Sequence, residues 1–134
     1  MAHEFFNPET LAPPVGFSHA VVPASGKTVY LGGQTGVDGA GKVVAPGLVE
    51  QFDSAAANVI TALEAAGGQA DHLVSIQIFV TSAAEYRRSL KEIGEVYRKH
   101  FGRHYPALAL FEITGLFDPD AKVELWCVAV IPDA

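Results

Sequence analysis

Residues 48–81, which decide the fold, read LVEQFDSAAANVITALEAAGGQADHLVSIQIFVT. From Leu48 to Ala66, apolar side chains recur every three or four positions, which places them on one stripe of a helix. Gly67 and Gly68 are expected to end this helix, because glycine readily leaves the helical conformation. From His72 to Thr81, every second residue is apolar and β-branched, which predicts a strand. The segment therefore predicts a helix that packs on a sheet.

The flanking segments add four strands and one more helix. Before the central segment, two short apolar runs are separated by turn residues at hairpin spacing, after an irregular arm at residues 1–16. A glycine-rich loop is expected at Gly32–Lys42. The further elements are strands at Phe17–Val22, Lys27–Gly32, Ala107–Thr114 and Lys122–Ile131 and a helix at Ala83–Phe101. The predicted order is β-β-α-β-α-β-β, an α/β fold whose two helices can cover one face of the sheet.

Both faces of the predicted sheet are apolar. On the last strand, Leu125 and Cys127 share one side. Trp126 and Val128 share the other side with Glu124. Because two helices can cover only one face, the second face must be buried against something else. We therefore expect a homo-oligomer that packs through the sheet, with Glu124 in its interface.

The composition is that of one soluble domain spanning residues 1–134. Of the 134 residues, 49% are hydrophobic, and the formal net charge is −6. This charge argues against nucleic acid as a partner, because phosphate contacts need a segregated basic face. The first residues do not resemble a secretory signal, and the apolar run at Leu125–Ile131 is too short to span a membrane. The expected location is the cytoplasm.

Three local patterns fit known sites only in part. Gly36–Lys42 has the spacing of a phosphate-binding loop, but Val43 stands where Ser or Thr should hold the metal ion, which favours a plain glycine turn. His100 and His104 have i, i+4 spacing without the Glu of a zinc protease, which favours two exposed histidines and no metal site. Cys127, in mid-strand, is expected to be a buried, inert thiol.

The second predicted helix carries most of the positive charge. Six of the nine basic residues fall between Arg87 and Arg103. They alternate with Glu85, Glu92 and Glu95, which is typical of a solvated, ion-paired helix face.

Glu124 is the one acidic residue within an otherwise apolar strand. A carboxylate that is buried without a cationic partner can act as a general acid or base near neutral pH. The alternative is that Glu124 pairs with a basic residue or lies exposed at the rim of the sheet. Periodicity alone leaves both interpretations open.

Seven short motifs follow one another along nearly the whole chain. They are Gly16–Ala20, Leu31–Gln34, Glu64–Gly68, Val74–Thr81, Tyr97–Phe101, Tyr105–Ala107 and Val123–Leu125. In this order and spacing the chain resembles the YjgF/Rid family, the reactive intermediate deaminases formerly called L-PSP endoribonucleases. The resemblance implies a chorismate-mutase-like fold and a homotrimer with ligand clefts between subunits. It also implies hydrolysis of imines and enamines such as 2-aminoacrylate, without a metal or cofactor.

Several residues that the resemblance assigns to substrate binding depart from the family's pattern. The family's substrate-clamping arginine falls at Leu108, and its first-strand tyrosine falls at Phe17. The serine before its Gly-Gln pair falls at Gly32, and its second-helix asparagine falls at Gly94. Together these changes predict a larger, more apolar cleft without a fixed positive charge.

The family's glutamate is kept as Glu124, which the resemblance makes the catalytic residue. Its expected role is to position and activate water. Backbone N–H groups at Leu108, Ala109 and Leu110 are expected to stabilise the developing charge. Gly33 completes the set of expected substrate-binding residues.

Two classes of function remain open. In the first, the protein is a divergent Rid-type deaminase or hydrolase of a small imine, enamine or related carbonyl compound that is bulkier and less acidic than 2-aminoacrylate. In the second, a homotrimer binds a small molecule without catalysis, and Glu124 only orients the ligand. A third function, ribonuclease activity, is favoured only by the family's older label, and the negative charge argues against it.

Overall fold

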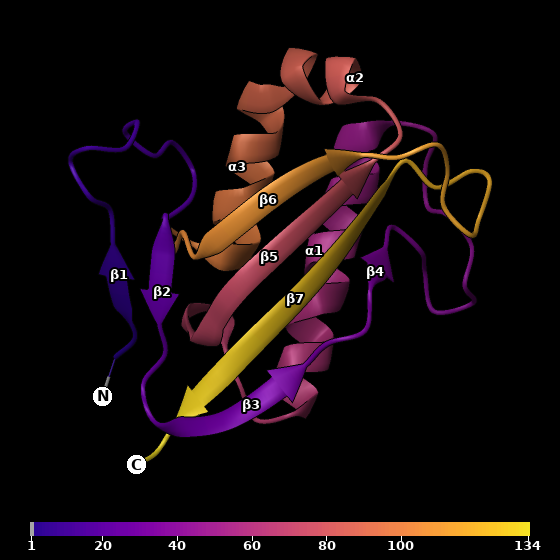
Figure 1. Ribbon diagram of the computed structural model, residues 1–134. Coiled ribbons are helices and arrows are strands. Elements are labelled where there is room, and N and C mark those ends of the chain that lie inside the picture. Colours follow the sequence, from indigo (N-terminus) through magenta and orange to yellow (C-terminus); the bar gives the residue numbers. More distant parts are fainter. Residues whose placement is uncertain (1) are drawn as a thin grey trace.

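The fold is built on one mixed sheet, and the computed structural model describes residues 2–134. Its strands are β3 Gly26–Tyr30, β4 Gln34–Thr35, β5 Leu73–Val80, β6 Ala107–Glu112 and β7 Val123–Pro132. Four of them lie side by side in the order β3-β7-β5-β6, and β4 also pairs with β7 (Figure 1). β5 and β6 are parallel, whereas β7 is antiparallel to β3, β4 and β5.

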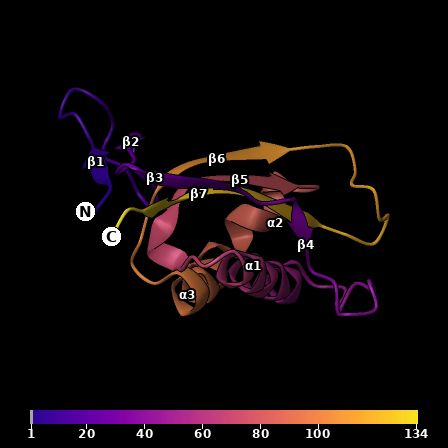
Figure 2. The ribbon, with the colours of Figure 1, turned by 90° about the horizontal axis from the view of Figure 1, so that it is seen from below.

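All the α-helices described cover the same face of this sheet, as Figure 2 shows. They are α1 Leu48–Ala65, α2 Ala83–Arg88 and α3 Leu90–Phe101, and a 3₁₀ turn, η1 Ala70–His72, precedes β5. The connection through α2 and α3 is the crossover that the parallel strands β5 and β6 require. The α/β class and the covering of one face by helices are thus confirmed. No helix within residues 2–134 is both long enough and apolar enough to cross a membrane.

The core lies between α1 and the covered face of the sheet. The apolar stripe of α1 packs against alternate residues of β5 and β7, and each of these side chains is at most 1% exposed. They are Phe52, Ala55, Val59 and Leu63 of α1, Ile76 and Ile78 of β5, and Leu125 and Cys127 of β7. The prediction of a buried thiol is confirmed, and burial raises the pKa of Cys127 to about 12. The thiol therefore stays protonated and inert at neutral pH.

The second predicted helix is divided in two. α2 begins after Ser82, whose hydroxyl accepts a hydrogen bond from the backbone N–H of Glu85 at 3.1 Å. Ser89 has φ −102° and ψ 13°, outside the range of a regular helix, and α3 starts after it. The prediction of one helix over 83–101 is therefore wrong at Ser89. Tyr86 and Leu90 keep helical spacing across the break, so periodicity could not reveal it.

The two N-terminal strands do not form a hairpin with each other. β2 Ala20–Val22 pairs with a strand in the arm, β1 Glu4–Phe6, so the prediction of an irregular arm at residues 1–16 is wrong there. β3 instead pairs with β7, and Gly26 approaches Ile131 so closely that a Cβ atom would overlap its carbonyl. His3 fixes the arm, because its ring bonds to the N–H of Ala24 and to the carbonyl of His72. These pairings depend on contacts between residues far apart in the sequence.

The glycine-rich loop contains β4 and a tight turn. The Asp38 carboxylate accepts hydrogen bonds from the N–H groups of Ala40 and Lys42, at 2.9 and 3.0 Å. Gly41 has φ +80°, a conformation that favours glycine. The glycines of this loop therefore form a turn. The sequence likewise favours a plain glycine turn over a phosphate-binding loop.

Candidate functional site

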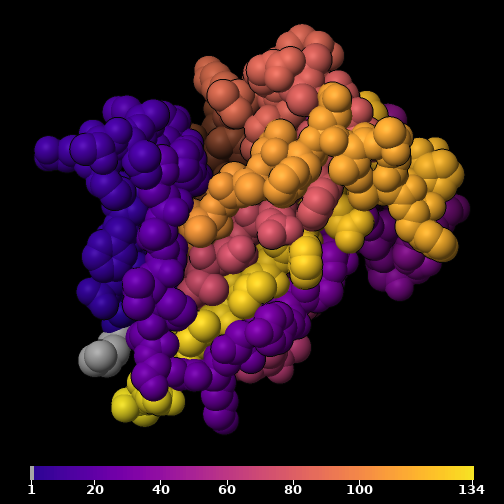
Figure 3. All heavy atoms as spheres, viewed as in Figure 1, coloured from indigo at the N-terminus to yellow at the C-terminus, as the bar shows by residue number. Residues whose placement is uncertain are grey.

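The face of the sheet that no helix covers carries Glu124 among aromatic side chains. Figure 3 shows this face, with β7 between β3 and β5. Glu124 lies opposite Phe79 of β5 in the strand register. The rings of Phe79 and Phe111 stack with their centroids 5.4 Å apart, and Trp126 is 48% exposed. The uncovered face is thus apolar around one carboxylate, as the sequence predicts.

The Glu124 carboxylate lies against Gly33 and is unpaired within the described chain. A Cβ atom at residue 33 would overlap Oε2 of Glu124, so only glycine leaves room for the carboxylate there. Within residues 2–134, none of the salt bridges involves Glu124. Glu124 borders two hollows of about 490 and 580 Å³, one beside Trp126 and the other beside Thr35. A half-buried, unpaired carboxylate beside open space can accept a proton from a bound water.

A second group of predicted residues lines a cleft of about 660 Å³. The cleft lies between α3, β6 and the arm at residues 14–17. The predicted substrate-binding residues in it are Phe17, Gly94, Leu108 and Leu110. The side chains around them are mostly aliphatic or aromatic, which agrees with the expected apolar cleft.

Three tyrosines that are not among the predicted site residues also line the cleft. Tyr97 donates its hydroxyl to the carbonyl of His104 at 2.6 Å, so that group is occupied. Burial raises the pKa of Tyr86, which therefore stays protonated and can donate a hydrogen bond. Tyr105 stacks on Tyr97 with ring centroids 5.4 Å apart. The wall of the cleft is therefore largely aromatic.

The cleft and Glu124 lie on opposite faces of the sheet. Leu110 is in register with Ile78, which is buried beneath the helices. The next residue of β5, Phe79, is in register with Glu124. Because neighbours along a strand point to opposite faces, Leu108 and Leu110 face the helices and Glu124 faces away from them. One copy of the chain therefore does not bring the two groups together.

Ala109 and Gly32 belong to neither group. Ala109 is exposed, and strand alternation places it on the uncovered face. Its strand, β6, is the edge of the sheet, so beyond the isolated bridge between Ala107 and Ser18 alternate N–H groups of β6 have no partner strand. Gly32 lines none of these hollows, and a Cβ atom there would meet open space.

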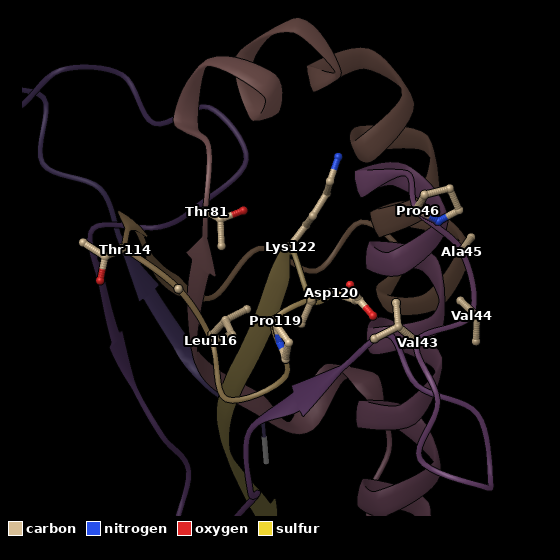
Figure 4. Close-up of a pocket in the computed structure, with 12 residues that line it drawn as sticks. Val43, Val44, Ala45, Pro46, Thr81, Thr114, Leu116, Pro119, Asp120 and Lys122 are labelled. Carbon is tan, nitrogen blue, oxygen red and sulfur yellow. The ribbon is translucent and has the colours of Figure 1, made fainter.

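A further hollow, of about 860 Å³, contains none of the predicted site residues (Figure 4). It lies between residues 43–46 and the loop that leads into β7. Figure 4 shows the Lys122 side chain pointing away from Val43, and its Nζ pairs with Glu85 at 3.1 Å. Its cation is thus already neutralised. Volume alone would favour this hollow as the functional site. The chemistry of the lining residues instead favours the cleft and the hollows beside Glu124.

The two histidines at the end of α3 are half-buried and bond to separate partners. His100 donates to the carboxylate of Asp53, and this bond, with a smaller contribution from Lys99, lowers the pKa of Asp53. His104 donates to the carbonyl of Leu73 at 2.7 Å. The prediction that both histidines are exposed is therefore wrong. Over residues 2–134, no group of three or more His, Cys, Asp or Glu side chains could hold a metal ion.

Arg98 also lines the cleft, although the alternating charges of its helix predict a solvated, ion-paired face. It takes part in none of the salt bridges formed within residues 2–134. The expectation of a cleft without positive charge is therefore wrong. The available signal was the i, i+4 spacing of Gly94 and Arg98 on one helix, which lets a long side chain lie over a glycine.

This mixed sheet, with helices on one face and a lone glutamate on the other, defines a small protein of the YjgF/L-PSP fold. The family model described as Endoribonuclease L-PSP matches residues 8–131. The chain therefore belongs to this family, the YjgF/Rid family.

Individual relatives agree with this assignment. The chain is 29% identical over 105 residues to 2-iminobutanoate/2-iminopropanoate deaminase of Capra hircus, a match that covers 78% of this chain and 73% of that protein. It is 30% identical over 119 residues to RutC family protein UK114 of Drosophila melanogaster, covering 88% and 81%. The solved structure of the Rid-family protein YyfB from Yersinia pestis superposes with a TM-score of 0.88 at 27% identity, covering 98% of this chain and all of that chain.

Proposed function

We propose that the protein is a cofactor-independent Rid-type deaminase of the cytoplasm, which hydrolyses a small imine or enamine in clefts between the copies of a homotrimer. The observation that carries this proposal is the unpaired Glu124 carboxylate, seated against Gly33 beside two hollows. Similarity to an iminobutanoate and iminopropanoate deaminase supports the reaction class.

The reaction needs one group that moves protons. An enamine first tautomerises to its imine. Glu124 then accepts a proton from water while the water oxygen bonds to the carbon of the C=N bond, and it returns that proton to the nitrogen, which gives a neutral carbinolamine. Glu124 next takes the proton of the new hydroxyl and passes it to the amino nitrogen as the C–N bond breaks, so that a C=O bond forms and ammonia leaves. Unpaired N–H groups of the edge strand β6, near Leu108–Leu110, are suited to stabilise negative charge that develops during the addition.

The positions of the two groups support a cleft that is shared between copies. Glu124 and Gly33 lie on the uncovered face, whereas Phe17, Gly94 and Leu108 lie on the helix side. A second copy that covers the apolar face of the first would bury Phe111 and Trp126 and bring its own cleft to Glu124. Such a heterologous contact repeats around a ring, and three copies would then hold three sites.

The substrate is expected to be larger and more apolar than 2-aminoacrylate. Leu108 offers no charge-assisted bond to a small carboxylate, and the cleft of about 660 Å³ is lined mainly by apolar and aromatic groups.

The test is ammonia release from freshly generated 2-aminoacrylate and from the 2-imino acids derived from leucine and phenylalanine. We expect faster turnover of the larger imino acids, and Leu108→Arg should shift the preference toward 2-aminoacrylate by about 10-fold or more. Equal, uncatalysed rates for every imine would overturn the proposal.

The contact between Gly33 and Glu124 gives a second test. Gly33→Ala is expected to displace the carboxylate, and a shift of about 1 Å in a catalytic group can lower the rate by roughly 100-fold. Gly39→Ala is the matched control, since a Cβ atom there meets nothing within 4 Å and Gly39 lines neither of the hollows beside Glu124. Steady-state rates of ammonia release measure both variants. Equal rates for the two would show that the position of Glu124 does not matter.

Ligand binding without catalysis is the second candidate, and the absence of a cation at Leu108 favours it. In this case the cleft still binds an apolar compound, but Glu124 only orients it. Ligand binding together with uncatalysed ammonia release from all the imines would support this candidate over the deaminase.

A further inference from the structure

The cleft beside Phe17 contains one charged side chain. Among the residues of the described chain that line it, Arg98 alone carries a full charge, and the others are aliphatic residues, aromatic residues, proline or glycine. Arg98 forms no salt bridge within residues 2–134. A cation beside an apolar cavity is therefore available to an anionic ligand.

Gly94 makes room for this guanidinium. A Cβ atom at residue 94 would lie 3.3 Å from Nη1 and 3.9 Å from Nη2 of Arg98. The end of the arginine side chain thus lies back over its own helix, one turn away, and borders the cleft, while the residue keeps contact with solvent. Because Gly94 has no side chain, it also leaves space at the wall of the cleft.

Arg103 does not compete for this role. It lies beyond the end of α3 and is absent from the lining of the cleft. Arg87 and Arg88, on α2, are also absent from that lining. The position of Arg98 is therefore specific among the arginines of the chain.

We propose that Arg98 binds the carboxylate of the substrate, and that the cleft takes 2-imino acids with a large apolar side chain. This inference rests on the proposed function for the reaction and for the apolar side chain of the substrate, and it adds the residue that binds the carboxylate. The planar guanidinium offers two parallel donors that match a carboxylate. Leu108 and Leu110 contact the apolar side chain, which an arginine at residue 108 would exclude.

Binding of stable analogues tests the assignment without any turnover. The two probes are 3-phenylpropanoate and its uncharged match, 3-phenylpropanamide, each titrated into the full-length protein by NMR. We expect the carboxylate to bind about 10-fold more tightly, since charge-assisted bonds are strong but Arg98 is partly solvated. Arg98→Gln should reduce the difference to within about twofold, whereas Arg98→Lys should keep part of it.

Arg103→Gln is the matched control, and it should keep the full preference for the carboxylate. Equal affinity of the two probes for the parent protein would overturn the assignment, and so would a preference that survives Arg98→Gln. Ammonia release by the same proteins separates the two proposals. An Arg98-dependent preference without ammonia release contradicts the deaminase alone, whereas ammonia release with the KM for the imino acid unchanged by Arg98→Gln contradicts the role of Arg98 alone.

Discussion

Glu124→Gln is expected to lower the rate of imine hydrolysis by about 100-fold or more, because the amide cannot accept a proton from water. The fold should be unaffected. Glu124 is half-buried and takes part in none of the salt bridges of residues 2–134, so the glutamine replaces it without leaving a partner unpaired. The change in the free energy of unfolding should be below about 0.5 kcal/mol.

Ammonia release measures the rate, and a urea titration measures stability. Glu92→Gln is the control, since Glu92 is an exposed residue of α3 outside the cleft. It should keep the parent rate. If Glu124→Gln instead dissociates or precipitates, Glu124 has a structural role and its assignment as the catalytic base is wrong.

Gln51→Leu is expected to give the largest loss of stability, about 3 to 5 kcal/mol, because it leaves three backbone groups unpaired. Gln51 is fully buried, and its amide donates to the carbonyls of Ala45 and Asp120 at 2.9 and 3.1 Å. Its oxygen accepts from the N–H of Lys122 at 2.7 Å. One side chain thus joins α1 to the loops on either side of the hollow in Figure 4.

Urea unfolding of the purified protein checks this expectation. Gln34→Leu is the matched control, since Gln34 makes one long hydrogen bond of 3.4 Å, to the carbonyl of Gly32. Its cost should be below about 1 kcal/mol. Similar losses for the two variants would show that the three bonds of Gln51 contribute no more than one exposed bond.

The central helix and strand could be predicted because their periodicity is local. Residues 48–65 repeat with the period of a helix, and residues 73–80 alternate, so each pattern reports its own element. Glu124 could be identified for a related reason, since a single acidic residue in an apolar strand is visible in the sequence without knowledge of the residues around it in space. The fold class and the uncovered apolar face follow from the same patterns.

Long-range contacts account for what the sequence did not reveal. β1 pairs with β2, and His3, just before β1, bonds to the carbonyl of His72, which is distant in the sequence. Gln51 interrupts an apolar stripe, and only the fold shows that it joins residues as far apart as 45 and 122. Arg98 falls on a charged helix, and beyond its spacing from Gly94 it is the cavity that distinguishes it from its neighbours.

The most direct test of a site shared between copies is complementation between two inactive variants. Glu124→Gln removes the proposed base, and Gly94→Leu fills the cleft beside Arg98 on the other face of the sheet. Each variant alone should fail to release ammonia from the imino acid derived from phenylalanine. Co-expressed with different tags and purified through both, they should regain roughly a third of the parent rate, since each mixed trimer has one of its three sites with both halves intact. A mixed assembly as inactive as either variant would contradict a catalytic site built from two copies.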